Sequence, residues 1–281
     1  MTSIKYLIPR IARHFLPESL AIWLLKHGWI IKPGLETISP QQAAERYSSH
    51  LGEHHLTLKG MRVMVFGYGG NLSIAAWLLS AGARHVVLVE RAGLPKKYDL
   101  DEIAKQFPQF FSKYSDGFKI DPQYISIFHY DINALAKENT FSPVDLVLTS
   151  SVYEHLEQPE VITHALAQLI DNGGSHLHFI DLRDHYFTYP FEMLCHSQSV
   201  WRTWLNPTSN LNRYRITDYL TLFKKYFLDV HLITEAADLP NFTKCKGRIR
   251  SEFLSGNDEM DCITQICLVA SKPRFPQEGD V

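Results

Sequence analysis

Residues 65–91 read VFGYGGNLSIAAWLLSAGARHVVLVER, and this stretch decides the fold. It starts in an apolar run and continues through a glycine-rich turn at 67–70. An apolar helical segment follows, and then a second apolar run that ends on Glu90. Two buried strands joined by a helix form a βαβ unit, whose strands are parallel. We therefore predict a parallel sheet around this unit, with a ligand site at the glycine turn.

The alternation of strand and helix patterns continues along the chain. Apolar runs occupy 62–66, 85–90, 125–130, 144–150 and 176–180, and helical patterns separate them at 72–81, 101–107 and 159–170. A helix at 216–227 then precedes two late strands, at 229–234 and 263–271. No long helical pattern joins these two strands, so we expect the last strand to be antiparallel and inserted between the fifth and the sixth. The fold class is α/β, with a doubly wound, mostly parallel, seven-stranded Rossmann-like sheet.

Two further segments accompany the sheet. Residues 1–59 form an N-terminal helical extension, and residues 60–281 form the main domain, with an inserted cover segment at about 181–215. The apolar run at 19–31 is shorter than the roughly 20 residues that a spanning helix needs. We expect the N-terminal helices to pack on the main domain. The weaker alternative is contact with a membrane surface, because Lys5, Arg10 and Arg13 flank apolar positions.

The composition favours a cytoplasmic protein with a small-molecule substrate. The 281 residues carry a formal net charge of −2, which gives no general attraction to nucleic acid. The four cysteines contain no CxxC pair, and no secretory signal precedes them, so neither disulfides nor a zinc site is predicted. The sequence leaves the oligomeric state open.

The glycine turn restricts the choice of cofactor. Gly67 and Gly69 allow positive φ and a close approach of the ligand, while Asn71 is placed to cap the following helix. Glu90, about 20 residues further on, suits the two hydroxyls of a ribose. A dinucleotide fingerprint requires a small residue where Leu72 stands, and no Gly-Lys-Ser/Thr triplet follows. These features favour a cofactor that has a ribose and lacks a pyrophosphate, while a NAD(P)-dependent oxidoreductase stays as an alternative.

The chain resembles the class I S-adenosylmethionine-dependent methyltransferases of small molecules. The resemblance lies in four segments between about residues 60 and 180: VMVFGYGGN, VLVE, the pair Tyr130 and Asp131, and VDLVLTSSVYEHL. It implies S-adenosylmethionine as the cofactor and methyl transfer to an oxygen or nitrogen of a sugar or secondary metabolite. An inactive, methyltransferase-like binding protein is the third reading.

The resemblance also implies roles for individual residues. Gly67 and Gly69 lie under the methionine part of the cofactor, in a turn that includes Tyr68 and Asn71. The remaining cofactor contacts are Glu90 at the ribose, Asp131 at the adenine amine, and Thr149 and Ser150 at the methionine and methyl end. Two positions depart from the family pattern: Val65 replaces an acid, and Asn71 replaces a third glycine.

The candidate catalytic residues follow the fourth and fifth strands. His185 is the preferred general base for an acceptor hydroxyl, because it follows a strand end and lies beside carboxylates that raise its basicity. Asp181 is its partner, and His155, next to Glu154, is the second candidate. We expect His176 and His178, which alternate along the fifth strand, to be satisfied core histidines.

Metal binding is the alternative for the same segment. Asp181, Asp184 and His185 together could bind Mg²⁺, but Arg183 among them more naturally pairs with the aspartates, so no metal site is predicted. Aromatic residues of the cover segment, with Asn212, Arg213 and Arg215, are interpreted as acceptor-orienting groups. The alternative is a second hydrophobic core beneath a long loop.

Overall fold

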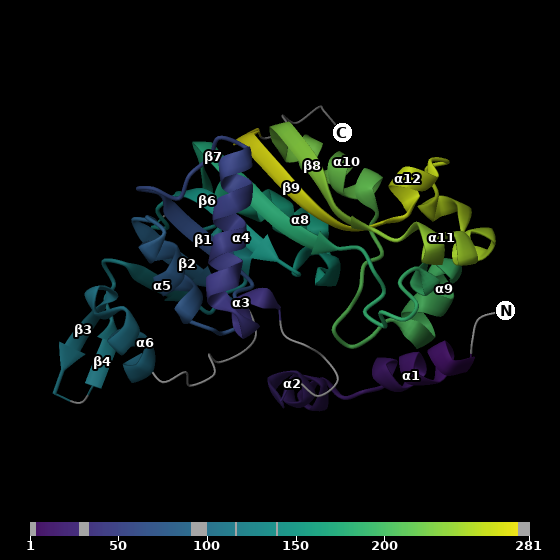
Figure 1. The fold of residues 1–281 in the computed structure, drawn as a ribbon, viewed down its shortest axis with the longest axis horizontal. Helices are drawn as coiled ribbons and strands as arrows, with labels where there is room; N and C mark the ends of the chain where they lie inside the picture. Colours follow the sequence, from purple (N-terminus) through teal and green to yellow (C-terminus); the bar gives the residue numbers. More distant parts are fainter. Residues whose placement is uncertain (1–3, 28–33, 91–99, 116, 139, 275–281) are drawn as a thin grey trace.

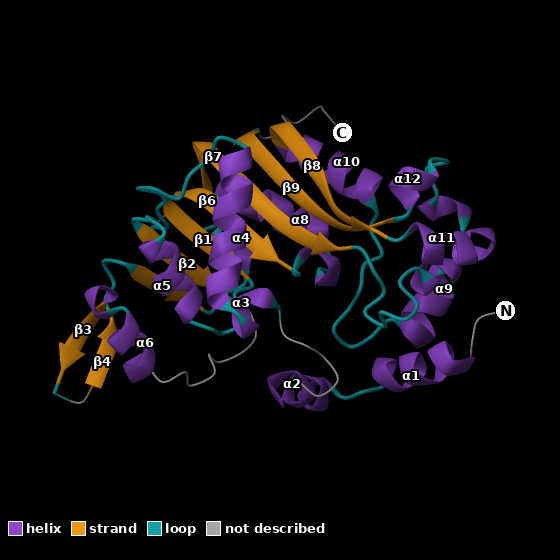
Figure 2. Ribbon diagram, in the orientation of Figure 1, coloured by secondary structure: helices purple, strands orange, loops and turns teal. Residues whose placement is uncertain are grey.

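A seven-stranded sheet forms the centre of the protein (Figures 1 and 2). The structure is a computed structural model, and it describes residues 4–27, 34–90, 100–115, 117–138 and 140–274. The strand order is β5-β2-β1-β6-β7-β9-β8. The strands are β1 (Arg62–Phe66), β2 (His85–Val89), β5 (Ile125–Phe128), β6 (Val144–Ser150), β7 (Ile170–Asp181), β8 (Phe227–Ala237) and β9 (Ile263–Pro273).

The pairing of the strands confirms the predicted topology. β1 is parallel to β2 and β6, β2 is parallel to β5, and β6 is parallel to β7. β9 lies between β7 and β8 and is antiparallel to both. The winding reverses at β1, where β2 lies on one side and β6 on the other. The carboxyl ends of β1 and β6 therefore border the crevice in which ligands bind in open sheets of this kind.

Helices cover both faces of the sheet (Figure 2). One apolar cluster joins Val65 and Leu148 to α4 (Pro40–Glu53), α5 (Ser73–Ser80) and α6 (Leu100–Gln106). A second cluster, on the opposite face, joins Met64 and Val147 to α7 (Ile132–Leu135), α8 (Pro159–Gln168) and α10 (Ile216–Tyr226). Side chains of a strand alternate between the two faces, so neighbouring residues of one strand belong to different clusters.

The N-terminal segment forms helices, as predicted. These are α1 (Ile4–His14), α2 (Glu18–His27), α3 (Leu35–Ile38) and α4. α1 packs against the cover segment and buries Tyr6 and Arg10, while Ile4, Ile8 and Phe15 are exposed. No helix within the described ranges is long and apolar enough to cross a membrane. Contact with a membrane surface stays a prediction, and residues 28–31 of the apolar run lie outside the described residues.

The cover segment contains short helical turns around a core of its own. The turns are η3 (Glu192–Cys195), α9 (Gln198–Val200) and the π-helical η4 (Trp201–Leu205). They pack with α11 (Leu239–Cys245), and Phe191, Trp201 and Phe242 are almost fully buried between them. The shorter elements η5 (Lys246–Arg248), η6 (Ser251–Phe253) and α12 (Asp258–Asp261) follow before β9. Of the two interpretations of this segment, a second hydrophobic core is the correct one for Trp201.

One small element is absent from the sequence prediction. A two-stranded antiparallel ribbon, β3 (Phe111–Tyr114) and β4 (Gly117–Ile120), follows α6 and the turn η1 (Pro108–Phe110). Each of its strands has four residues and is mostly half-buried or exposed. Such short strands leave no periodic pattern that a sequence can reveal.

Candidate functional site

The glycine turn follows the end of β1 and has the backbone conformation that its sequence predicts. Gly67 and Gly69 have φ of 77° and 67°, in the left-handed region that glycine adopts without cost. A Cβ on Gly67 would lie 2.5 Å from Val152, and a Cβ on Gly69 would lie 2.1 Å from Thr37 Oγ1. Both positions therefore require glycine for conformation and for space.

Glu90 follows β2 and lies against this turn. The strands β1 and β2 are parallel neighbours, so their carboxyl ends meet at one edge of the sheet. There the carboxylate of Glu90 accepts a hydrogen bond from the Gly69 N–H at 3.2 Å. Tyr68 is buried in the same turn, and its burial and the charge of Glu90 raise the pKa of its hydroxyl to about 12. An acid is thus held beside a turn that exposes backbone to a ligand.

Asn71 stabilises the start of α5 and ties the turn to the N-terminal segment. Its Oδ1 accepts a hydrogen bond from the Ser73 N–H at 3.0 Å, although the N-cap residue of α5 is Leu72 and not Asn71 as predicted. Its Nδ2 donates to the Thr37 carbonyl at 3.0 Å, and the Thr37 hydroxyl donates to the Gly69 carbonyl at 3.3 Å. α3 is therefore fastened across the glycine turn.

The other predicted cofactor residues occupy different surroundings. Asp131 is exposed after β5, where it caps α7 by accepting from the Asn133 N–H at 2.8 Å. Thr149 is fully buried, and its hydroxyl is 2.8 Å from His178 Nδ1 inside the sheet. The Thr149 side chain therefore lies in the core. Ser150, the next residue of β6, points to the opposite face of the sheet, where it interacts with Glu36 of α3.

Glu36 is a candidate site residue that the sequence analysis did not identify. The residue is 3% exposed, and its carboxylate accepts a hydrogen bond from the Tyr47 hydroxyl at 2.6 Å. Burial raises its pKa, while the Tyr47 and Ser150 hydroxyls oppose this rise. These partners come from α4 and β6, so no local sequence pattern indicates the arrangement.

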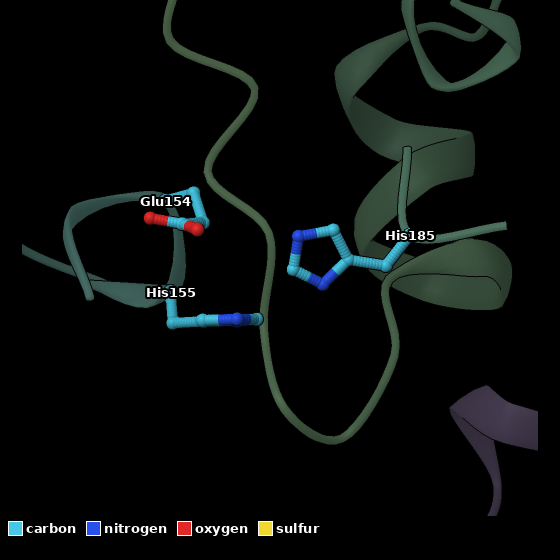
Figure 3. A group of neighbouring side chains, drawn as sticks. All are labelled: Glu154, His155 and His185. Atoms are coloured by element: carbon cyan, nitrogen blue, oxygen red, sulfur yellow. The ribbon is translucent and has the colours of Figure 1, made fainter. Parts of the chain in front are cut away.

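Glu154, His155 and His185 come together beyond the carboxyl ends of β6 and β7 (Figure 3). One ligand-capable atom of each residue lies within 4.8 Å of those of the other two. Figure 3 shows Glu154 and His155 on one short turn, with His185 reaching toward them from a separate segment. That turn is η2 (Tyr153–His155), directly after β6, and His185 follows β7. Because β6 and β7 are parallel neighbours, residues 30 positions apart meet at the same sheet edge.

His185 is less basic than the sequence analysis expects. Burial lowers its pKa to about 3, and the neighbouring His155 contributes to this shift. Asp181 opposes the shift, but its carboxylate is held by Arg183 in a salt bridge of 2.6 Å. The expectation that nearby carboxylates raise the basicity of His185 is therefore wrong, because desolvation and a second imidazole outweigh them.

Asp184 does not join His185 and Asp181 in a metal site. It is fully buried, and it forms a salt bridge with Arg10 and accepts a hydrogen bond from the Tyr6 hydroxyl at 2.6 Å. This network links α1 to the segment after β7. The Mg²⁺ alternative is thus not supported, since Asp184 is paired with Arg10 and Asp181 is paired with Arg183.

The polar residues at the end of the cover segment also have structural roles. Arg213 donates to the carbonyls of Met193 and His196, and Arg215 donates to those of Leu182, Asp261 and Ile263. Asn212 Nδ2 donates to the carbonyls of Tyr153 and Leu156. Both arginines are at most 5% exposed. Their interpretation as acceptor-orienting groups is wrong, because their donors are used to hold the cover segment in place.

His176 and His178 are core residues, as predicted, but His176 is not fully satisfied, because its Nε2 has no hydrogen-bond partner within the described residues. Both are fully buried on one face of β7, and His176 Nδ1 lies 3.1 Å from His178 Nε2. Their burial lowers the pKa of His176 to about 3 and that of His178 well below its usual value. They are therefore neutral and lie away from the ligand edge.

Comparison with known proteins supports the fold. No protein-family model and no curated protein sequence matches the chain. A candidate O-methyltransferase from Nostoc punctiforme has a TM-score of 0.51 and 14% identity, with 94% of this chain and 70% of that chain covered. The 1,6-didemethyltoxoflavin-N1-methyltransferase of Burkholderia thailandensis, with bound 1,6-didemethyltoxoflavin and S-adenosylhomocysteine, has a TM-score of 0.48 and 10% identity, with 98% and 92% covered.

At such identities the likeness concerns the fold, and it rests on the Nostoc structure. The strand order supports the same fold. The last strand is antiparallel and lies between the fifth and sixth strands of the sheet, and this insertion distinguishes the sheet from a nicotinamide-binding one. The chain therefore has the fold of the class I S-adenosylmethionine-dependent methyltransferases.

Proposed function

We propose that this protein transfers a methyl group from S-adenosylmethionine to an oxygen or nitrogen of a small molecule. The observation that carries the proposal is the contact between Glu90 and the Gly69 N–H, at the carboxyl ends of two adjacent parallel strands. A carboxylate there accepts hydrogen bonds from the two ribose hydroxyls of a nucleoside, while the turn accommodates the methionine part.

The other cofactor contacts extend along the same edge of the sheet. Asp131 after β5 is the proposed partner of the adenine amine, and Ser150 at the end of β6 borders the methyl end. The Thr149 side chain is directed into the core, so we assign only its backbone to this border. Tyr68 and Asn71 shape the turn and its link to α3.

A nicotinamide cofactor fits this site less well. Leu72 is 5% exposed and packs into the core beside β1, in the position where a dinucleotide site requires a small residue. A leucine there keeps the helix start away from the space that a pyrophosphate would occupy.

The acceptor side lies at the ends of β6 and β7. Methyl transfer from a sulfonium is an in-line displacement, so the protein must align the nucleophile and exclude water. A hydroxyl acceptor must also lose its proton, and Glu154, His155 and His185 are the groups placed to assist. Acting alone as a base, His185 is weak, because a pKa of about 3 is far from neutral pH.

Calorimetric titration of the full chain with S-adenosylmethionine tests the proposal, with NAD⁺ and NADP⁺ titrated in parallel. We expect saturable binding of the methyl donor and none of the nicotinamides. Incubation of a metabolite extract with methyl-labelled donor, followed by mass spectrometry, should then reveal a labelled product. Binding of a nicotinamide instead would favour an oxidoreductase, and donor binding without any transfer would favour a binding protein.

A further inference from the structure

We propose that Glu154, His155 and His185 bind one divalent first-row transition-metal ion, and that this ion activates the methyl acceptor. Metal binding is argued from the described side chains alone, whereas the activation of an acceptor rests on the proposed function. The three residues form the one group of three or more potential ligands found among the described parts of the chain.

Glu154 gives the strongest reason for a cation at this position. Its side chain is 3% exposed, and neither carboxylate oxygen has a hydrogen-bonding partner within the described residues. A buried carboxyl group without partners is costly, and a bound cation removes that cost.

His155 is held in the tautomer that a metal ligand needs. Its Nδ1 lies 2.9 Å from the Ser209 carbonyl oxygen and 2.8 Å from that of Asn210, so Nδ1 carries the proton and donates it. Nε2 then has a free lone pair. Hydrogen bonding of one imidazole nitrogen to a carbonyl is the usual way in which proteins orient a metal-binding histidine.

His185 completes the set from the neighbouring strand end. Its ring centre lies 4.8 Å from that of His155, with the two planes at 72°. The preceding residue, Asp184, is fixed by Arg10 and Tyr6, which positions the segment that carries His185.

The ligand set indicates the class of metal. Two imidazoles and one carboxylate suit Zn²⁺, Mn²⁺, Fe²⁺ or Co²⁺, whereas Mg²⁺ prefers oxygen ligands throughout. Ligand atoms about 2.0 to 2.2 Å from one ion stand roughly 3 to 4 Å apart, so small side-chain rotations bring the three atoms into range. Three protein ligands also leave coordination positions open for the acceptor.

The methyl acceptor and S-adenosylmethionine are the only reactants in the step proposed at this ion. An acceptor hydroxyl would bind the metal through its oxygen. Binding would lower the pKa of that hydroxyl, and the hydroxyl would then release its proton to solvent. The resulting oxygen attacks the methyl carbon of the sulfonium, so an O–C bond forms while the S–C bond breaks. The electron pair of the broken bond stays on sulfur, and neutral S-adenosylhomocysteine leaves.

Metal titration of the chelator-treated full chain tests the inference. We expect Zn²⁺ and Mn²⁺ to bind at a single site, Mg²⁺ to bind far more weakly, and Co²⁺ to give a visible spectrum with imidazole ligation. Glu154→Gln, which keeps the shape of the side chain, and His185→Ala should each weaken binding at least about 100-fold. His231→Gln, which removes an exposed histidine on β8, should leave binding unchanged.

The same samples separate this inference from the proposed function. Circular dichroism checks that the variants fold, and S-adenosylmethionine titration checks the donor site. Absence of stoichiometric Zn²⁺ or Mn²⁺ binding in a protein that binds the methyl donor would overturn the metal site and leave the proposed function standing. Metal binding that survives both Glu154→Gln and His185→Ala would also overturn it. An active enzyme that chelators do not affect but His185→Ala inactivates would restore His185 as the base.

Discussion

At the scale of single residues, Glu90 offers the sharpest test of the donor site. Glu90→Ala removes a charged acceptor of two ribose hydrogen bonds, so the affinity for S-adenosylmethionine should fall by about 1.5 to 3 kcal/mol. Calorimetry measures the change. Glu157→Ala, which removes an exposed carboxylate outside the donor site, is the matched control. Unchanged affinity in a folded Glu90→Ala variant would remove Glu90 from the site.

Two glycines in the same chain should respond to alanine in opposite ways. Gly67→Ala places a Cβ at a φ of 77° and 2.5 Å from Val152, so the free energy of unfolding should fall by about 1 to 3 kcal/mol. Gly52→Ala, near the end of α4, meets no atom within 4 Å and should raise it by up to about 1 kcal/mol. Urea denaturation compares the two. Equal effects would show that the turn does not constrain Gly67.

At the scale of elements, the buried pair of Arg10 and Asp184 should hold α1 in place. Arg10 is 1% exposed and Asp184 is fully buried. Asp184→Ala leaves a buried guanidinium without its partner, which costs about 3 to 5 kcal/mol unless α1 detaches. We expect lower stability together with faster hydrogen exchange in α1. Glu160→Ala breaks the exposed pair with Lys225 and should lower stability far less, because solvent screens that pair. Protected α1 amides in Asp184→Ala would contradict this role.

The elements that the sequence predicted correctly are those with local signals. Apolar runs of strand length and the helical periods between them identified β1, α5 and β2. The lack of a long helical pattern between the last two strands indicated the antiparallel insertion of the last one. Arg213 and Arg215 were misassigned because their partners are backbone carbonyls from other parts of the chain. Composition shows that a segment contains arginine, but not whether its donors are already used.

At the scale of the whole molecule, the sequence predicts only those parts of the site that the ends of neighbouring strands bring together. Parallel strands bring Glu90 to the glycine turn, and the sequence showed this through its spacing alone. Glu36 reaches Ser150 only through the packing of α3, and Asp184 faces α1 rather than His185. Neither contact follows from a local pattern, since each joins segments more than 100 residues apart.

The buried histidines of β7 should make the stability of the whole domain depend on pH. Desolvation lowers the pKa of His176 to about 3 in the folded protein, whereas an unfolded histidine titrates near 6.5. The unfolded state therefore binds the additional proton first as the pH falls. The contribution of His176 to stability is fully present above about pH 6.5 and is lost progressively between there and about pH 3.

His176→Asn isolates this contribution, because the amide is neutral at every pH and keeps a polar atom near His178 Nε2. Between pH 6 and pH 5 the free energy of unfolding should fall less steeply in this variant than in the native protein, by about 1 kcal/mol. Titrating groups that do not contact His176, including Glu36 and Glu154, act equally on both proteins and cancel in the difference. Urea denaturation at pH 7, 6 and 5 provides the values, with the exposed His129→Asn as the control. Parallel pH profiles for the native protein and His176→Asn would mean that His176 accepts a proton in the folded state as readily as in the unfolded one.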